Sequence, residues 1–162
     1  MRRWGERNYI STTAGLLGDV LYRQGRYDES AEFAAVCEHL ASLDDVDSQF
    51  LWRCVRGKLR ARQGEIGEAE SLLSAAMALI ETSDQLDLQG NGLMDLAEVR
   101  ELAGTPASAA ALCERAAGRY ERKGNVVSAR RAHQLAERLL SQADRAAAVG
   151  REGPPRNRPQ TA

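Results

Sequence analysis

The chain has 162 residues, a length that suits a single domain. Its 22 Lys and Arg residues nearly balance its 23 Asp and Glu residues, which gives a formal net charge of −1 at pH 7. Proteins that neutralise nucleic-acid phosphates usually carry a clear basic excess, so the balance argues against nucleic-acid binding. Ala, Leu, Glu and Arg dominate the sequence, and these residues favour helices. The composition predicts an all-α protein.

The first feature in chain order is the start, MRRWGERNYIST, where two arginines have no apolar stretch behind them. We therefore expect no secretory signal, and no later stretch is long and apolar enough to span a bilayer. Cys37, Cys54 and Cys113 are far apart and belong to no CxxC motif. These features predict a cytoplasmic protein without a membrane partner, whose reduced thiols pack as small apolar groups.

Three glycines divide the chain at nearly equal intervals. Gly25, Gly64 and Gly104 are 64 − 25 = 39 and 104 − 64 = 40 residues apart, and they lie in the similar turn sequences RQGRYDES, RQGEIGEA and LAGTPASA. A fixed period of this size is typical of helical repeat arrays. Small or apolar residues recur five, nine and twelve positions after each glycine, which places them on one face of a helix. They are Ser30, Ala34 and Cys37, then Ala69, Leu73 and Ala76, then Ala109, Cys113 and Ala116.

The first helix of each unit ends at the same turn. Gly18, Gly57 and Ala97 lie seven residues before the three turn glycines, where a small residue allows a second helix to cross closely. The expected organisation is a lead-in at 1–8, a repeat domain at 9–143 and a disordered tail at 144–162. Within the domain we predict repeats at about 9–42, 48–82 and 86–122, followed by a capping helix at 126–143. The tail is rich in Gly, Pro and Arg and has too few apolar residues to form a core.

These residues resemble the tetratricopeptide (TPR) family, whose pattern is W-x2-L-G-x2-Y in one helix and A-x3-F in the next. The matching positions are Leu17, Gly18, Leu21, Gly25 and Tyr27, then Gly64, Ala69, Leu73 and Ala76, then Leu96, Ala97, Gly104, Ala109, Cys113 and Ala116. The first Trp and the closing Pro of the family are absent, and the period exceeds the usual ~34 residues. The resemblance implies a right-handed helical-hairpin solenoid of three TPR-like repeats plus a capping helix, in which stacking buries a face that one hairpin cannot bury.

A narrower resemblance is to the C-terminal TPR region of bacterial class III adenylate and guanylate cyclases that also carry a P-loop ATPase module. It rests on GERNYIST, LYRQGRYDE, LMDLAEVREL and YERKGNVVSARRA. The chain contains no G-x-x-x-x-G-K-[ST], since RGKLR lacks the loop and the Ser or Thr. The activities of those enzymes therefore do not carry over. A cyclase or ATPase module, in cis or in trans, remains a partner that the resemblance suggests.

No catalytic, cofactor-binding or metal-binding set can be assembled from the sequence. His39 and His133 have no partner at motif spacing, and the paired acids occur in turns and at helix starts. We therefore predict a protein that is not an enzyme. Three arginines, Arg53, Arg56 and Arg60, form one helical stripe. It is interpreted either as a solvated face with stems over apolar neighbours or as a basic strip in a groove.

The TPR resemblance also implies a concave groove lined by the first helix of each repeat. The residues expected to face a ligand there are Asp19, Tyr22, Arg23, Lys58, Arg62, Met94, Glu98 and Glu101. Their mixed charge favours a peptide or protein partner over a polyanion. We expect Lys58 and Arg62 to be exposed, so that reversing both to Glu weakens binding and leaves the fold intact.

The function predicted from the sequence is a protein–protein interaction scaffold, without chemistry of its own, that binds its partner in this groove. One alternative is a regulatory C-terminal segment, or a remnant, of a bacterial signalling ATPase or nucleotide cyclase. An RNA-binding helical repeat is a third possibility, against which the charge balance argues.

Overall fold

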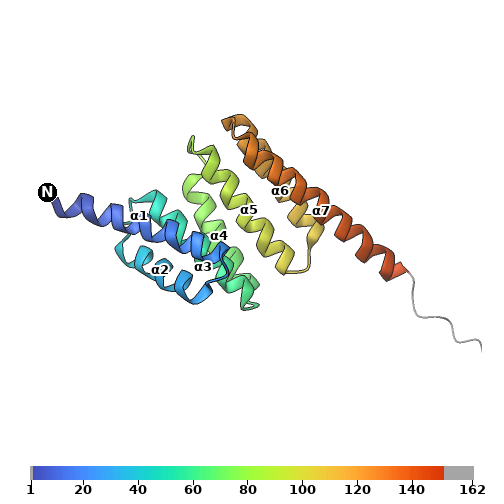
Figure 1. The fold of residues 1–162 in the computed structure, drawn as a ribbon, viewed down its shortest axis with the longest axis horizontal. Coiled ribbons are helices and arrows are strands. Elements are labelled where there is room, and N and C mark those ends of the chain that lie inside the picture. The colour runs from blue at the N-terminus through green and yellow to red at the C-terminus, as the bar shows by residue number, and fades with distance from the viewer. Residues whose placement is uncertain (1, 152–162) are drawn as a thin grey trace, which may run out of the picture.

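The computed structural model describes residues 2–151, with side chains described for 9–148, and all of its regular structure is helical. The helices follow one another in a row from the N-terminus to the C-terminal end (Figure 1). Their bounds are α1 Arg2–Arg23, α2 Tyr27–Leu40, α3 Val46–Arg62, α4 Ile66–Ile80, α5 Leu86–Leu102, α6 Pro106–Lys123 and α7 Val126–Arg151. The all-α prediction is confirmed for this part of the chain.

One turn geometry joins α1 to α2, α3 to α4, α5 to α6 and α6 to α7. Gly25, Gly64, Gly104 and Gly124 have φ of 77°, 85°, 74° and 83°, a left-handed conformation that favours glycine. In the first turn, the Gly25 N–H donates to the Tyr22 carbonyl and the Arg26 N–H donates to the Leu21 carbonyl. The other turns repeat this pair of bonds, which satisfies carbonyls left free at the end of each helix.

The helices joined by these turns pack against each other, and neighbouring pairs meet through α2 with α3 and α4 with α5. The first helices also touch directly, α1 with α3 and α3 with α5. All nine small or apolar residues predicted on one face of the second helices are buried. Their exposed fractions lie between 0% and 3% for Ser30, Ala34, Cys37, Ala69, Leu73, Ala76, Ala109, Cys113 and Ala116.

Close helix crossings explain the small residues of the first helices. The Ser30 hydroxyl donates to the Gly18 carbonyl at 2.8 Å, which fixes α2 against α1. At Gly57 an added Cβ would lie 3.2 Å from the Ala69 carbonyl oxygen and 3.0 Å from Leu73 Cγ. The packing of α3 on α4 is therefore tight at this position, and a side chain here would require α4 or Leu73 to shift by a few tenths of an ångström.

Both ends of the described chain are more helical than the sequence predicts. The region predicted as a lead-in belongs to α1, which begins at Arg2. At the other end α7 continues to Arg151, past the end predicted at Ala143. The rest of the predicted tail, 152–162, lies outside the described residues. No helix within 2–151 is both long enough and apolar enough to cross a membrane.

Candidate functional site: a charged groove

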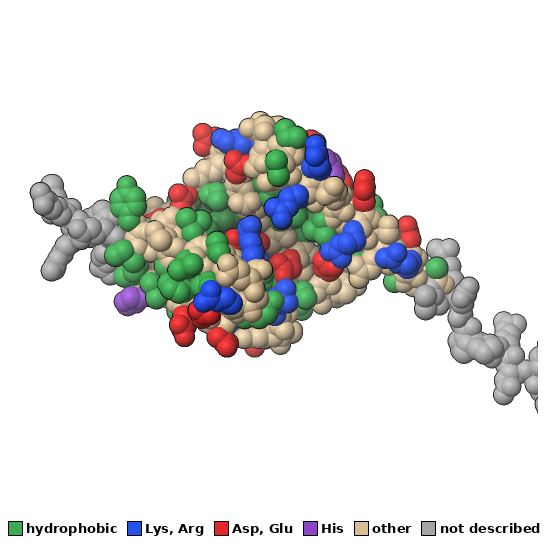
Figure 2. All heavy atoms as spheres, viewed as in Figure 1, with side chains coloured by type: hydrophobic (Ala, Val, Ile, Leu, Met, Phe, Trp, Pro, Cys, Tyr) green, Lys and Arg blue, Asp and Glu red, His purple; other side chains and the backbone are tan. Residues whose placement is uncertain are grey.

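A groove of about 630 Å³ runs along the first helices and ends against α6 and α7. This volume is in the range of ligand-binding clefts. Basic and acidic side chains gather around the hollow in the middle of the face drawn in Figure 2. Seven of the eight residues predicted to face a ligand line the groove, namely Tyr22, Arg23, Lys58, Arg62, Met94, Glu98 and Glu101. The eighth, Asp19, lies beside them and binds Lys58.

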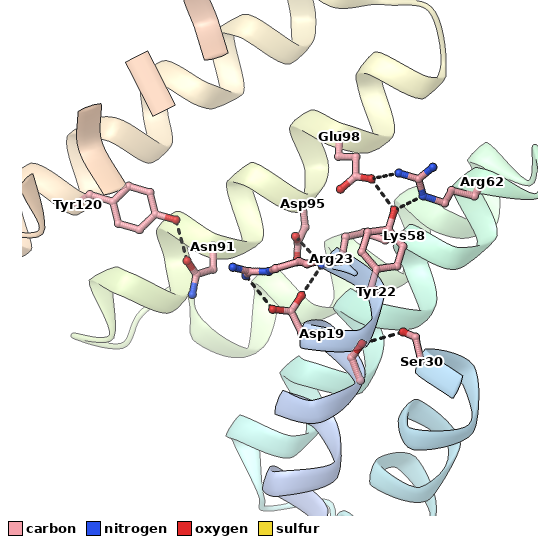
Figure 3. A network of polar contacts seen from close by, with 11 residues as sticks. Asp19, Tyr22, Arg23, Ser30, Lys58, Arg62, Asn91, Asp95, Glu98 and Tyr120 are labelled. Atoms are coloured by element: carbon pink, nitrogen blue, oxygen red, sulfur yellow. Dashed lines mark hydrogen bonds and ion pairs between the residues drawn. The ribbon is translucent and has the colours of Figure 1, made fainter. Parts of the chain in front are cut away.

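Lys58 is the centre of the polar network at the floor of the groove (Figure 3). Its Nζ lies 2.6 Å from an Asp19 carboxylate oxygen and 3.0 Å from an Asp95 carboxylate oxygen. These three side chains come from α3, α1 and α5, so a single ammonium group joins the three first helices. The Lys58 side chain is 2% exposed, and its Nζ also lies 4.6 Å from the centre of the Tyr22 ring.

The titration of this cluster is set by competition between burial and charge. Burial alone would lower the pKa of Lys58, but the carboxylates of Asp95 and Asp19 raise it above its ordinary value. Burial raises the pKa of Asp95 despite the neighbouring Lys58. Burial also opposes ionisation of Asp19, yet Lys58 and Arg23 lower its pKa. Lys58 is therefore held as a buried cation between two carboxylates.

This placement corrects the expectation that Lys58 is an exposed groove cation. Its ammonium group is occupied by two carboxylates, and reversing its charge would bury a third carboxylate beside them. The physical reason is that a long Lys stem reaches inward from α3 to meet acids on both neighbouring helices. Arg62 is different, because its side chain is 38% exposed.

A second set of contacts forms the groove wall next to Lys58. The Tyr22 hydroxyl donates to Glu98, while Arg62 Nε donates to that hydroxyl at 2.7 Å. Arg62 also pairs with Glu98 at 3.0 Å, and its guanidinium lies 4.7 Å from the centre of the Tyr27 ring. Burial and the Glu98 carboxylate raise the pKa of Tyr22. Tyr22 is therefore a neutral donor that joins α1 to α5.

The far end of the groove contains residues that the sequence interpretation missed. The Tyr120 hydroxyl donates to the Asn91 side-chain carbonyl at 2.7 Å, and Arg131 and Leu135 of α7 complete the lining. Among the residues with described side chains, Arg131 has no ion-pair partner, in contrast to Glu101, which pairs with Arg138 at 3.0 Å. The groove thus keeps one cation whose charge is not already matched.

Two of the groove residues that the sequence interpretation missed could have been found from the sequence. Asn91 and Asp95 continue the stripe of Met94 and Glu98 by steps of three and four residues, so they belong to the same face of α5. No sequence pattern indicated Tyr120 and Arg131, since their position depends on how α6 and α7 pack against α5.

The arginine stripe on α3 lies outside the groove lining. The Arg53 guanidinium covers the Trp52 ring at 4.2 Å, Arg56 pairs with Glu38 at 2.6 Å, and Arg60 pairs with Glu65 at 2.8 Å. This arrangement favours the interpretation of a partly solvated face with ion pairs to neighbouring helices.

The remaining reactive side chains form no further centre in the described part of the chain. Cys37, Cys54 and Cys113 are free thiols in the interior, and burial raises the pKa of each. Among the described residues, no three His, Cys, Asp or Glu side chains are placed to hold a metal ion.

Comparison with known proteins adds no relative. No protein family, curated protein or solved structure matches this chain.

Proposed function

We propose that this chain is a TPR-type helical solenoid that binds a peptide or protein segment in the groove and has no catalytic activity of its own. The observation that carries the proposal is the groove itself, which takes residues from α1, α3, α5, α6 and α7. Its lining mixes cations, acids, two tyrosines and the apolar side chains of Met94, Leu102 and Leu135. Such a surface offers hydrogen bonds and apolar contacts along its length, as an extended peptide requires.

The three-repeat arrangement is part of the same proposal. It is supported by the recurrence of one turn geometry and by the burial of the same positions after each turn glycine. Stacked units of this kind present a concave surface built from equivalent helices. A regulatory role inside a larger signalling protein, the alternative suggested by the sequence resemblance, would use the same groove.

The test is selection of peptides from a random displayed library on the purified chain, followed by affinity measurement with the selected peptides. Arg131 is the residue to change, because it lines the groove without an ion pair. Arg131→Glu should lower the affinity for peptides selected on the wild-type chain about tenfold, which corresponds to about 1.4 kcal/mol. Arg130→Glu is the matched control, since Arg130 is the exposed neighbour on α7 and is not part of the groove lining.

Two outcomes would contradict the peptide-binding part of the proposal. One is selection that yields no peptide above background. The other is equal binding by both arginine variants, which would place the binding surface elsewhere. Turnover of ATP or GTP by the purified chain would contradict the non-catalytic part.

A further inference from the structure

The part of the groove between α5 and α7 differs from the rest. Among the described helices, α1 packs directly on α3 and α3 on α5, whereas α5 and α7 share no comparable contact. Side chains join these two helices near each end, where Asn125 donates to Asp87 at 3.0 Å and Arg138 pairs with Glu101 at 3.0 Å. The two contacts hold α5 and α7 parallel, and the groove takes its lining from both helices between them.

These contacts also fix which residues face each other across the gap. The offset between the helices is 125 − 87 = 38 residues at one contact and 138 − 101 = 37 residues at the other. Asn91 is therefore opposite Ser128, and Met94 is opposite Arg131, with Leu135 one turn further along α7. All five residues line the groove, which changes from polar to apolar along this direction.

Hydrogen-bond donors are left unused at the polar end of the gap. The Tyr120 hydroxyl donates to the side-chain carbonyl of Asn91 at 2.7 Å, so the amide N–H groups of Asn91 remain available. Arg131 forms no ion pair within the part of the chain whose side chains are described. Arg23 reaches the same end from α1, where it pairs with Asp19 at 2.7 Å but stays 64% exposed. Its guanidinium end points toward Asn91 in Figure 3.

The titration of Tyr120 responds to both arginines. Burial, Asp95 and Asp87 raise the pKa of Tyr120, whereas Arg23 and Arg131 lower it. A Coulombic effect on the same hydroxyl requires both guanidinium groups to lie near it. Two cations from the opposite ends of the row of helices therefore converge on one place in the groove.

The charge balance indicates which chemical group fits there. The lining has a net charge of 4 − 3 = +1. Its charged members are Arg23, Lys58, Arg62 and Arg131, then Asp95, Glu98 and Glu101. The three acids already have cationic partners, so Arg131 supplies the surplus charge. One carboxylate would neutralise the groove, whereas a phosphate group carries nearly two negative charges and would be repelled by the neighbouring acids.

An apolar subsite follows one helical turn away. Met94 and Leu135 pack against the same buried cluster, which joins α5, α6 and α7. Arg131 and Leu135 are four residues apart on α7, a rise of about 6 Å. Two residues of an extended peptide span about 6.6 Å, and side chains at i and i+2 point to the same face. An extended peptide along α7 thus places two alternate side chains on Arg131 and Leu135.

We propose that this part of the groove selects peptides in which an acidic side chain, Asp or Glu, lies two residues from an apolar one. The acidic carboxylate pairs with Arg131 and Arg23 beside the Asn91 amide, and the apolar side chain packs between Met94 and Leu135. This specificity rests on the proposed function, because it requires that the groove binds a peptide.

The experiment is sequencing of the peptides that a random displayed library yields on the purified full chain. Asp or Glu two positions from an apolar residue should be enriched relative to the unselected library. Selection on the Arg131→Gln variant should lose this enrichment. The matched control, Arg130→Gln, should keep it, because Arg130 is the exposed neighbour on α7 and is not part of the groove lining.

A double-mutant cycle then tests the contact itself. For one selected peptide, Arg131→Gln and replacement of the peptide's acidic residue by its amide should each weaken binding roughly fivefold. Both changes together should weaken binding no further, since they remove the same ion pair. Arg131 is exposed, so circular dichroism should show that its replacement leaves the fold intact.

The outcomes separate this specificity from the proposed function. Binders without the acidic pattern, or two changes that add to roughly twenty-five-fold, would overturn the acidic subsite and leave peptide binding in place. A library that yields no binder at all would overturn both the proposed function and the specificity that rests on it.

Discussion

Lys58 illustrates how one buried charge can connect three helices that are distant in sequence. Its ammonium group is desolvated, and its two carboxylate partners offset that cost. Replacing such an ion pair entirely by apolar groups can be neutral, whereas removing one partner leaves an unpaired buried charge. Removing one member of the Asp19–Lys58–Asp95 cluster should therefore destabilise the fold more than replacing all three by apolar side chains.

The first prediction is that Lys58→Ala lowers the free energy of unfolding by about 3–5 kcal/mol, because two carboxylates remain without a cation. Urea denaturation monitored by circular dichroism measures this. Arg60→Ala is the control, since Arg60 also pairs with two acids but is 36% exposed. Its loss should cost less than about 1 kcal/mol. Equal effects of the two substitutions would show that burial does not distinguish them.

A second prediction at the residue scale concerns alkaline pH. The pKa of Tyr22 is raised in the folded chain above its ordinary value of 10.0, and that of Lys58 above 10.5. As pH rises past these values the unfolded chain loses protons that the folded chain retains, so stability present below pH 10 is lost. Each group contributes a slope of up to about 1.4 kcal/mol per pH unit.

Tyr22→Phe removes one of these groups and should make the decline shallower above pH 10. The measurement is the urea unfolding free energy of both proteins across this range. Parallel declines in the two proteins would show that Tyr22 does not lose its proton preferentially in the unfolded state.

At the scale of the element, the turns depend on glycine conformation and not on space. Gly104 has φ of 74° and an added Cβ would meet nothing within 4 Å. Gly104→Ala should therefore destabilise the chain by about 1–2 kcal/mol through backbone strain alone. Gly118 is the matched control, because it lies inside α6 and is equally uncrowded. Gly118→Ala should stabilise by about 1 kcal/mol, and melting curves that shift in the same direction would contradict this account.

The helix crossings give the next prediction. Ala69 is fully buried, and its carbonyl lies where α4 crosses Gly57 of α3. Ala69→Leu should overpack this crossing and cost about 1–3 kcal/mol. Ala75→Leu, on the exposed side of the same helix, should change stability little. Denaturant midpoints compare the two variants, and an unchanged midpoint for Ala69→Leu would mean that the crossing can relax.

These elements also show how far the sequence could predict the structure. The turns could be predicted from Gly25, Gly64 and Gly104, because a left-handed backbone conformation is a property of a single residue and favours glycine. The burial of Lys58 could not be read locally, because it depends on Asp19, 39 residues away, and on Asp95 from a third helix. The residues of α7 in the groove were missed for the same reason, as their position is fixed by packing against α6.

At the scale of the whole molecule, the helices differ in how many neighbours support them. In the centre, α3 packs against α1, α2, α4 and α5, while the main packing partner of α7 is α6. In a row of packed helices, local opening costs less where fewer interfaces must break. The two ends should therefore open before the centre does.

The last prediction follows from this gradient and is measured by amide hydrogen exchange in the native state. Amides around Val55 in α3 should exchange only through global unfolding. Those around Ala136 in α7 should exchange through a local opening that has a lower free energy. Both residues are buried, at 1% and 0% exposure, so a difference reports on stability and not on solvent contact. Urea should accelerate exchange at Val55 more steeply than at Ala136, because global unfolding exposes more surface. Equal protection and equal urea dependence at both sites would mean that the described helices unfold as one unit, with α7 held as firmly as the centre.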